Sequence, residues 1–274
     1  MSEAHNTKVI PFLKWAGGKR WFADRHTDLL PKSYRRYLEP FLGGGAVYFA
    51  IAPNEGIVSD VNADLISTYE VIRDEPTSLA SMLLEYHGRH CRDFYYEVRS
   101  NKPSDKVELA AWFIYLNRTC WNGLYRVNRY NEFNVPIGTK TDVTLSTDSF
   151  AVTSERLQST VIKCCDFEET IDLAEKDDFI FVDPPYTVKH NMNGFVKYND
   201  KIFSWSDQVR LRDAVVRATR RGALVMVTNA NHQSIRELYA DIGEHLPIKR
   251  ASVLAASATF RANVEELAIR TWLG

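Results

Sequence analysis

The chain has 274 residues, of which 45% are hydrophobic and 25% are charged, and its formal net charge is −1. This composition is ordinary for a globular protein of one large or two modest domains. The longest stretch without an acidic or basic residue, 40–54, holds three glycines and two prolines and is too short and too broken to span a bilayer. The N-terminus lacks the apolar stretch of a signal peptide, and the four cysteines show no CxxC spacing. These features favour a cytoplasmic protein with reduced thiols and no disulfide framework.

Charge is balanced overall but uneven along the chain. Segment 8–36 holds eight Lys or Arg against two Asp, and 210–221 holds five Arg against one Asp. Segment 166–183 holds eight acidic residues against one Lys. Single runs of this kind are often solvated faces. Together, in a neutral protein, they favour a basic groove beside an acidic site for a cationic ligand.

Strand-like and helix-like segments alternate over most of the chain. In chain order we expect a strand at 34–39, a glycine turn at 43–45, a strand at 56–59, a helix at 62–74, strands at 161–165 and 179–182, a helix at 206–221, a strand at 224–228 and an edge strand at 264–272. This alternation is typical of a parallel, doubly wound α/β sheet. Such sheets bind ligands beyond the carboxyl ends of their strands.

Segment 75–139 interrupts the alternation. Its pattern predicts two or three helices, around 77–87 and 105–119, followed by a hairpin-like stretch at 125–138 rich in Arg, Asn and Tyr. We therefore expect an inserted second domain at 75–139, with 1–74 and 140–274 forming the main domain.

The sequence Asp183-Pro184-Pro185-Tyr186 directly follows the predicted strand FIFV. Two prolines after a strand also fit a plain strand end. The chemical interpretation is more specific, because an exocyclic aromatic amine is a poor nucleophile while its lone pair is delocalised into the ring. The Asp183 carboxylate and a backbone carbonyl of the rigid proline turn can accept the amine's hydrogens and favour its pyramidal form. Tyr186 can stack on the base.

Three further pieces fit a nucleoside site. Glycines including Gly43 follow the first strand, where backbone can approach a ligand closely, and no GK[ST] follows to indicate phosphate binding. Asp60 ends the second strand, a position where an acid typically holds ribose hydroxyls. Asp166 and Phe167 end a third strand, where a polar group and an aromatic ring can grip adenine. Each piece alone also fits a turn glycine or a helix-capping aspartate.

Six segments appear in the order of one enzyme family and span nearly the whole chain. They are FLKWAGGK (12–19), EPFLGGGAV (39–47), SDVN (59–62), LNRTCWNGLYRVNRYNEFNVPIG (116–138), Asp166-Phe167 and DPPY (183–186). The chain thereby resembles the Dam-type DNA adenine-N6 methyltransferases. The resemblance implies a Rossmann-like S-adenosylmethionine methyltransferase sheet with helices on both faces, and a small, mostly helical target-recognition domain with a β-hairpin. It also implies methyl transfer to N6 of adenine in double-stranded DNA, within the family's usual site GATC.

The same resemblance assigns single residues to the cofactor and the target amine. Trp15 and Lys19 are expected at the cofactor's amino-acid end, with Phe41 and Gly43 in the glycine segment. Asp60 is expected at the ribose, Asp166 and Phe167 at the cofactor's adenine, and Asp183 at both the cofactor region and the target amine, together with the catalytic pair Pro184 and Tyr186.

DNA contacts are implied in two segments. Lys14 is expected to reach the first base pair of the target. Trp121, where the family often has Tyr, and Asn122 match the loop that enters the duplex as the target base leaves. The base-reading positions Leu124, Arg126 and Pro136, with Asn128 beside them, complete the expected DNA contacts. Arg can bind guanine bidentately, and apolar side chains can meet the thymine methyl.

The chain departs from the family pattern before its last strand. The loop 255–261 (AASATFR) carries one basic residue where the family usually has a loop rich in Gly, Ser and basic residues. His87, His90 and Cys91 have metal-like spacing, but no second cluster completes four ligands, so we expect no metal site.

The sequence is therefore interpreted as a cytoplasmic, monomeric adenine-specific DNA methyltransferase that uses S-adenosylmethionine, yields S-adenosylhomocysteine and needs no metal or membrane. Two alternatives stay open. One is a methyltransferase for another planar amine, in RNA, free nucleotides or a protein glutamine. The other is a catalytically silent DNA-binding protein, which the intact DPPY argues against.

Overall fold

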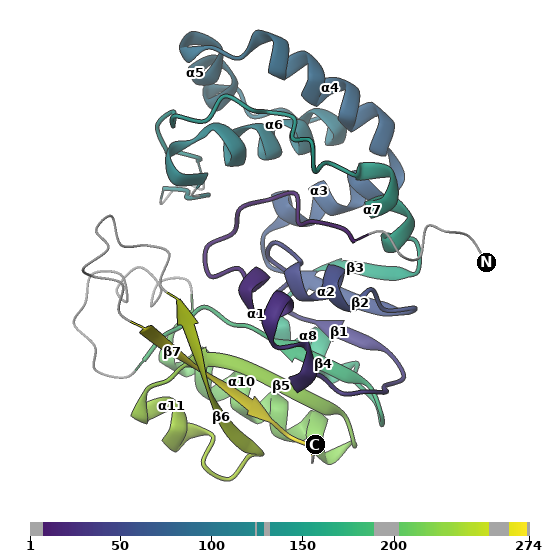
Figure 1. Cartoon of the computed structure of the whole chain (residues 1–274), viewed down its shortest axis with the longest axis vertical. Helices are drawn as coiled ribbons and strands as arrows, with labels where there is room; N and C mark the ends of the chain where they lie inside the picture. The colour runs from purple at the N-terminus through teal and green to yellow at the C-terminus, as the bar shows by residue number, and fades with distance from the viewer. Residues whose placement is uncertain (1–7, 124, 129–131, 189–202, 252–262, 273–274) are drawn as a thin grey trace. The chain divides into compact units, whose positions relative to one another are not determined.

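The computed structural model describes residues 8–123, 125–128, 132–188, 203–251 and 263–272. The chain folds as a mixed α/β protein around a seven-stranded sheet with the strand order β3-β2-β1-β4-β5-β7-β6 (Figure 1). The strands are β1 (Tyr37–Glu39), β2 (Gly56–Asp60), β3 (Thr160–Cys164), β4 (Phe179–Val182), β5 (Leu224–Ala230), β6 (Glu244–Ala251) and β7 (Asn263–Arg270).

Helices occupy most of the remaining described chain. They are α1 (Arg20–Arg25), α2 (Ala46–Ile51), α3 (Ala63–Asp74), α4 (Pro76–Arg89), α5 (Arg92–Ser100), α6 (Lys106–Thr119), α7 (Phe150–Leu157), α8 (Phe167–Asp172), α10 (Trp205–Arg220) and α11 (Gln233–Leu238), with 3₁₀ turns η2 (Thr27–Leu29) and η3 (Trp121–Gly123). The expected α/β class is confirmed.

Contacts divide the chain into two compact units. The first contains Met1–Ala23, Leu42–Asn54 and Asp60–Cys164, and the second contains Asp24–Phe41, Glu55–Ser59 and Cys165–Gly274. The predicted insertion 75–139 falls inside the first unit, which also holds α2, α3, α7 and β3. Its boundaries as a separate domain stay a prediction.

The second unit holds the parallel centre of the sheet and its antiparallel end. β1 pairs in parallel with β4, and β4 with β5, whereas β7 pairs antiparallel with both β5 and β6. The strand expected at 264–272 forms as β7, but it is not an edge strand as expected. It lies between β5 and β6, and Leu267, Ala268 and Ile269 are fully buried. The edge strand at this end of the sheet is β6, whose pattern in the sequence is obscured by Pro247 and several charged residues. Proline is tolerated on edge strands, where an N–H can be spared.

The acidic run and the arginine run of this unit neutralise each other. Arg210 donates to the Asp166 carboxylate at 2.7 and 3.0 Å, and Arg217 donates to Glu168 at 2.6 Å. Further pairs are Arg217–Asp172, Arg221–Asp172, Arg35–Asp178 and Arg36–Asp178. These acids are compensated within the protein. The acidic run as a whole thus does not form the cation-binding site expected from its charge.

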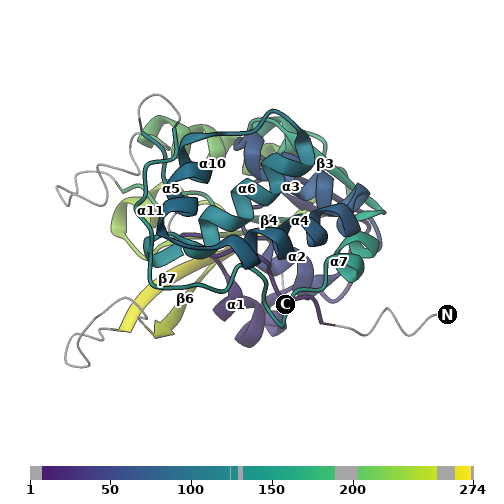
Figure 2. The same ribbon diagram turned by 90° about the horizontal axis from the view of Figure 1, so that it is seen from above.

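Three helices of the first unit, α3, α4 and α5, pack around α6. Residues 110–119 of this helix are all buried, and α3, α4 and α5 contact it; Figures 1 and 2 both show α4 and α5 beside α6. Asp105 caps α6 by accepting hydrogen bonds from the N–H groups of Val107 and Glu108. Such a cap satisfies amides that have no partner within the helix. The two expected helices at 77–87 and 105–119 are confirmed, and α5 is the third.

After α6 the chain folds back on itself. Antiparallel bridges join Cys120 to Ile137 and Val127 to Phe133. The N–H of Asn128 donates to the carbonyl of Glu132 at 2.9 Å. The hairpin-like stretch predicted at 125–138 is confirmed in its described residues.

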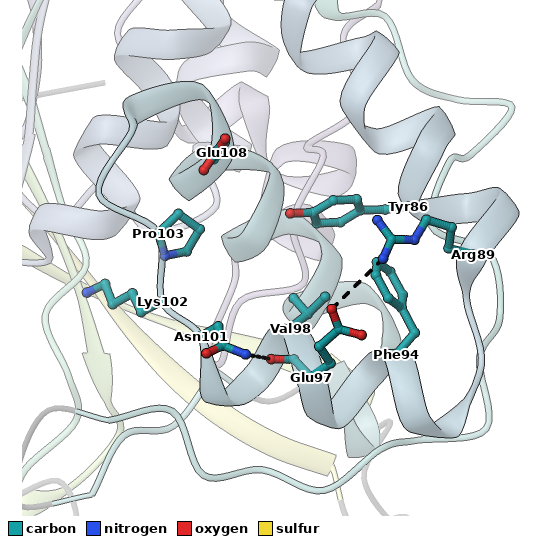
Figure 3. A pocket seen from close by; sticks show the side chains of 9 residues that line it. All are labelled: Tyr86, Arg89, Phe94, Glu97, Val98, Asn101, Lys102, Pro103 and Glu108. Atoms are coloured by element: carbon teal, nitrogen blue, oxygen red, sulfur yellow. Dashed lines mark hydrogen bonds and ion pairs between the residues drawn. The ribbon is translucent and has the colours of Figure 1, made fainter.

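A hollow of about 310 Å³ lies among α4, α5, α6 and the turn between α5 and α6 (Figure 3). Three of its polar residues bind one another, since Arg89 pairs with Glu97 at 3.9 Å and Asn101 donates to the Glu97 carbonyl at 2.8 Å, while Lys102 pairs with Asp64 outside the hollow. None of the residues expected at the cofactor, the target amine or the DNA lines it.

Candidate active site

The DPPY turn is held at the carboxyl end of β4, in the second unit. All four residues of β4 are buried, and Asp183 follows as a half-buried carboxylate. The hydroxyl of Thr228, on β5, donates to Asp183 Oδ1 at 2.7 Å. The side chain of Gln208, fully buried on α10, donates to the Pro185 carbonyl at 3.3 Å and accepts from Asn229 at 3.1 Å. Neighbouring elements thus fix the turn from two sides.

Tyr186 is oriented by a buried acid. Its hydroxyl donates to Glu266 Oε2 at 2.6 Å, and Glu266 is only 3% exposed on β7. Burial, together with the charges of Asp183 and Glu266, raises the pKa of Tyr186 well above its ordinary value. The phenol therefore stays protonated as a donor, and its ring is held in one orientation.

Two aromatic rings form a platform in the same unit. Phe41 and Phe167 stack with centroids 5.4 Å apart and an interplanar angle of 22°. Phe203 packs 5.6 Å from each of them. Phe41 is partly exposed, whereas Phe167 is buried. The Phe167 ring also has the Arg210 guanidinium 4.2 Å from its centroid, so Phe41 is the ring of the pair that can offer a face to a base.

Asp166 is engaged by the protein itself. It caps α8 by accepting from the Glu168 N–H at 2.9 Å, and Arg210 binds both of its oxygens. Partial burial acts to raise the pKa of Asp166, but the bonds from Arg210 and the Glu168 N–H outweigh it and the pKa lies below its ordinary value. The structure thus adds a capping role and an ion pair to the role expected at the adenine.

The glycine turn belongs to the first unit. Gly43 and Gly45 have φ values of +47° and +64°, in the left-handed region that favours glycine. A Cβ on Gly43 would lie 2.6 Å from Trp15 Cδ1, so only glycine fits beneath that ring. Tyr69 holds the turn from the other side by donating to the Gly43 carbonyl at 3.1 Å.

Asp60 is held by backbone donors. The Gly43 N–H donates to Asp60 Oδ2 and the Asn62 N–H donates to Oδ1, each at 3.0 Å. Burial raises the pKa of Asp60, while these bonds and one from the Val61 N–H act against the rise. The two carboxylate oxygens together offer about four acceptor positions, three of which these backbone N–H groups take, so one is left to accept a ligand's hydroxyl.

The N-terminal motif is tied to α6. The backbone N–H and carbonyl of Lys14 bond the side-chain amide of Asn117 at 3.0 and 2.8 Å. The Lys14 side chain is exposed. Lys19 is 4% exposed and donates to the Gly17 carbonyl at 2.8 Å, so it shapes the loop that carries Trp15.

Most described positions expected at the DNA present exposed side chains. Trp121 is 53% exposed, and Asn122, Arg126 and Pro136 are exposed as well. Arg126 donates to Asn134 across the hairpin at 3.2 Å. The other expected contacts differ: Asn128 donates to Glu132 at 2.9 Å and so closes the hairpin, while Leu124 and loop 255–261 lie outside the described residues.

Sequence reasoning missed the residues that support the site. Thr228 and Asn229 end the apolar strand β5, and polar residues at that position were a usable signal. Gln208 and Glu266 gave none, because their partners lie 23 and 80 residues away along the chain. Tyr69 is one apolar-face residue of a helix, and its bond to Gly43 depends on the tertiary fold.

Two negative findings concern the described residues alone. No cluster of three His, Cys, Asp or Glu side chains there could hold a metal ion. No helix in those ranges has both the length and the apolar character needed to cross a membrane.

Comparison with known proteins identifies the family. Residues 15–253 match the model of the D12 class N6 adenine-specific DNA methyltransferases. A type II methyltransferase of Lactococcus lactis subsp. cremoris is 34% identical over 98% of both chains, and one of Methanocaldococcus jannaschii is 36% identical over 81% of this chain and 85% of its own. The DNA adenine methylase of Escherichia coli is 31% identical over 93% of both chains. The chain belongs to the D12 class of adenine-specific DNA methyltransferases.

Proposed function

We propose that this adenine-N6 DNA methyltransferase uses S-adenosylmethionine as the methyl donor and acts on adenine within GATC, with the target base turned out of the duplex. The observation that carries the proposal is the DPPY turn, in which a strand end, Thr228 and Gln208 fix Asp183 and the two prolines. An enzyme acting on a base within duplex DNA has to bring its amine out of the stack.

The residues fit an adenosyl cofactor. Asp60 offers carboxylate oxygens to ribose hydroxyls, the Gly43 turn allows close backbone approach, and the Phe41–Phe167 platform offers an aromatic face to a base. No phosphate-binding sequence accompanies the turn, which suits a nucleoside rather than a nucleotide. When bound, S-adenosylmethionine supplies an electrophilic methyl group on a sulfonium and is converted into the thioether S-adenosylhomocysteine.

The protein's own contribution is positioning and electrostatics. Asp183 and the Pro184 carbonyl accept hydrogen bonds from the two N6 hydrogens, which favours the pyramidal amine with an available lone pair. N6 gains the methyl group, and the one proton that it gives up passes to the Asp183 carboxylate and from there to water. Tyr186, held by Glu266, stacks on the target base and stays protonated because its pKa is raised. No covalent enzyme intermediate or metal is required.

The partner is double-stranded DNA. Lys14, Trp121, Arg126 and Pro136 present exposed side chains, of which two are cationic and one is a large aromatic ring. Leu124 and Asn128 are proposed in the same role on the family match. We infer that the enzyme acts as a monomer in the cytoplasm of a bacterial or phage-infected cell. Membership of a DNA-specific family disfavours an RNA, free nucleotide or protein substrate.

A methyl-transfer assay with labelled S-adenosylmethionine tests donor and site together. We expect labelling of a GATC duplex, and none of the same duplex carrying N6-methyladenine at both GATC adenines. Equal labelling of duplexes with scrambled or single-base-changed sites would overturn GATC while leaving the donor standing. Labelling that depends on the sequence but peaks at another site would do the same.

A further inference from the structure

Trp15 lies between the Gly43 turn and the hairpin 125–138, and both belong to the first unit. Its ring edge covers Gly43 so closely that a Cβ there would be 2.6 Å from Cδ1 and 2.7 Å from Nε1. Its ring face stacks on Tyr125, with centroids 6.0 Å apart and an interplanar angle of 18°. A displacement of Tyr125 would therefore shift Trp15, and a shift of Trp15 would change the Gly43 turn that the cofactor is proposed to occupy.

Tyr125 also reaches the cofactor side by a second route. Its hydroxyl donates to Asp64 Oδ2 at 3.1 Å, in the first turn of α3. That turn is capped by Asn62, whose own N–H donates to Asp60 Oδ1. The phenol is therefore attached to the helix start that supports the proposed ribose-binding carboxylate. Burial, and next the Asp64 charge, raise the pKa of Tyr125, so the hydroxyl stays a donor.

On the DNA side, Tyr125 immediately precedes Arg126. The carbonyl of Arg126 accepts from the Asn134 N–H at 3.3 Å, and its side chain bonds the Asn134 amide. The Tyr125 ring packs on Phe113 at 4.6 Å and on Phe133, of the opposite hairpin arm, at 5.6 Å. Tyr125 is thus built into the hairpin that is proposed to read the bases.

We propose that Tyr125 is a positioning residue that couples DNA binding at the hairpin to cofactor binding at Gly43 and Asp60. The inference rests on the proposed function, because it takes the adenosyl cofactor to lie at those two residues. Packed contacts of this kind have few alternative arrangements, so a hairpin fixed by DNA favours one position of Trp15 and of the α3 start. Coupling is reciprocal, so cofactor binding must strengthen DNA binding by the same factor.

The test is a complete binding cycle. Dissociation constants of S-adenosylhomocysteine are measured by calorimetry with and without a saturating GATC duplex, and those of the duplex with and without S-adenosylhomocysteine. For the natural chain we expect each ligand to lower the dissociation constant of the other by on the order of 5-fold or more. In Tyr125→Leu the factor should fall toward 1, while binding of each ligand alone changes by less than about 3-fold.

Tyr125→Phe separates the two routes, because it keeps the stack on Trp15 and loses the bond to Asp64. We expect an intermediate coupling factor. Tyr86→Leu is the matched control: this half-buried tyrosine lies on α4, packs against Phe94 and Tyr115, and should leave the factor unchanged.

The outcomes separate the two proposals. No binding of S-adenosylhomocysteine by the natural chain would refute the proposed cofactor and the coupling with it. Binding of both ligands with a factor of 1 in the natural chain, or an undiminished factor in Tyr125→Leu, would refute the coupling alone. If Tyr125→Leu does not fold, an undiminished factor in Tyr125→Phe overturns the Asp64 route and a reduced one supports it.

Discussion

Asp60 and Asp166 occupy similar places in the sequence, since each lies at the end of a strand and shortly before a helix, yet their surroundings are opposite. Asp60 is held by the N–H groups of Gly43 and Asn62, and burial raises its pKa. Asp166 binds Arg210 and caps α8, and its pKa is lowered. Asp60 does not cap the helix that follows it, because Asn62 caps that helix.

The difference shows that a strand end does not by itself assign a ligand role. A carboxylate held only by neutral amides keeps an uncompensated charge and strong acceptor capacity for a ligand's hydroxyls. A carboxylate bound by a guanidinium already has its strongest donors within the protein. On this argument Asp60 contributes more to cofactor binding than Asp166, and substitutions at three strand ends can test the distinction.

The largest effect is expected at Asp183, which extends the comparison to the end of β4. Like Asp60 it accepts from a neutral donor, the Thr228 hydroxyl. Asp183→Ala should lower the rate of methyl transfer by on the order of 10²–10³ or more, the loss typical of removing one preorganised electrostatic contact. Single-turnover transfer to a GATC duplex measures it, and duplex affinity, measured in parallel, should largely survive. A variant that kept more than a tenth of the natural rate would remove Asp183 from amine activation.

Asp60→Ala should weaken the binding of S-adenosylhomocysteine by roughly 1–3 kcal/mol, because the ribose hydroxyls would lose a charged acceptor. Calorimetric titration measures the change. Asp60→Asn is the isosteric comparison: it removes the charge, keeps one acceptor oxygen and turns its NH2 toward one of the two backbone N–H groups, so it should also weaken binding. If both variants bind as tightly as the natural chain, the nucleoside site does not include the end of β2.

The contrast between these strand ends also marks how far the sequence predicts the structure. The strands 56–60 and 179–182 and helix α3 follow from local patterns of apolar residues and a capping Asn62, so they were predicted to within about a residue. The Gly43 turn and the DPPY turn were predicted because their chemistry lies in adjacent residues.

Partners that are distant in the chain could not be predicted in the same way. The bond between Arg210 and Asp166 spans 44 residues and the one between Tyr186 and Glu266 spans 80. Both depend on which elements pack together, and no local pattern encodes that. The same reason explains the misjudged acidic run, because its charge was visible and its arginine partners were not.

Asp166→Ala should act mainly on stability. Loss of the cap on α8 costs about 1 kcal/mol of the free energy of unfolding, within a usual range of roughly 0.5–2. Asp105→Ala is the control, because it removes a cap of the same type from α6, with no expected ligand nearby. Urea unfolding measures both, and S-adenosylhomocysteine affinity should change by less than about 3-fold in either. A loss of affinity in Asp166→Ala as large as that in Asp60→Ala would show that the guanidinium does not withdraw this carboxylate from the ligand.

The smallest effect is expected from Arg210→Gln, which removes the cation and leaves Asp166 closer to the setting of Asp60. The pair is partly exposed, so its contribution to the free energy of unfolding is about 0.2–1 kcal/mol at neutral pH. The sign of its pH dependence follows from the lowered pKa of Asp166. A carboxyl whose pKa is lower in the folded state stabilises the fold above its unfolded pKa, near 3.8, and loses that contribution as the pH falls through the folded value. The stability difference between the natural chain and Arg210→Gln should therefore be full at pH 6 and shrink below about pH 4.

Arg212→Gln, on the same helix and paired with Asp241, is the control for losing a surface arginine; it should leave S-adenosylhomocysteine affinity unchanged. If Asp166 does hold the cofactor once its charge is uncompensated, Arg210→Gln alone should tighten that affinity, whereas an equal response in both variants would limit Asp166 to capping α8.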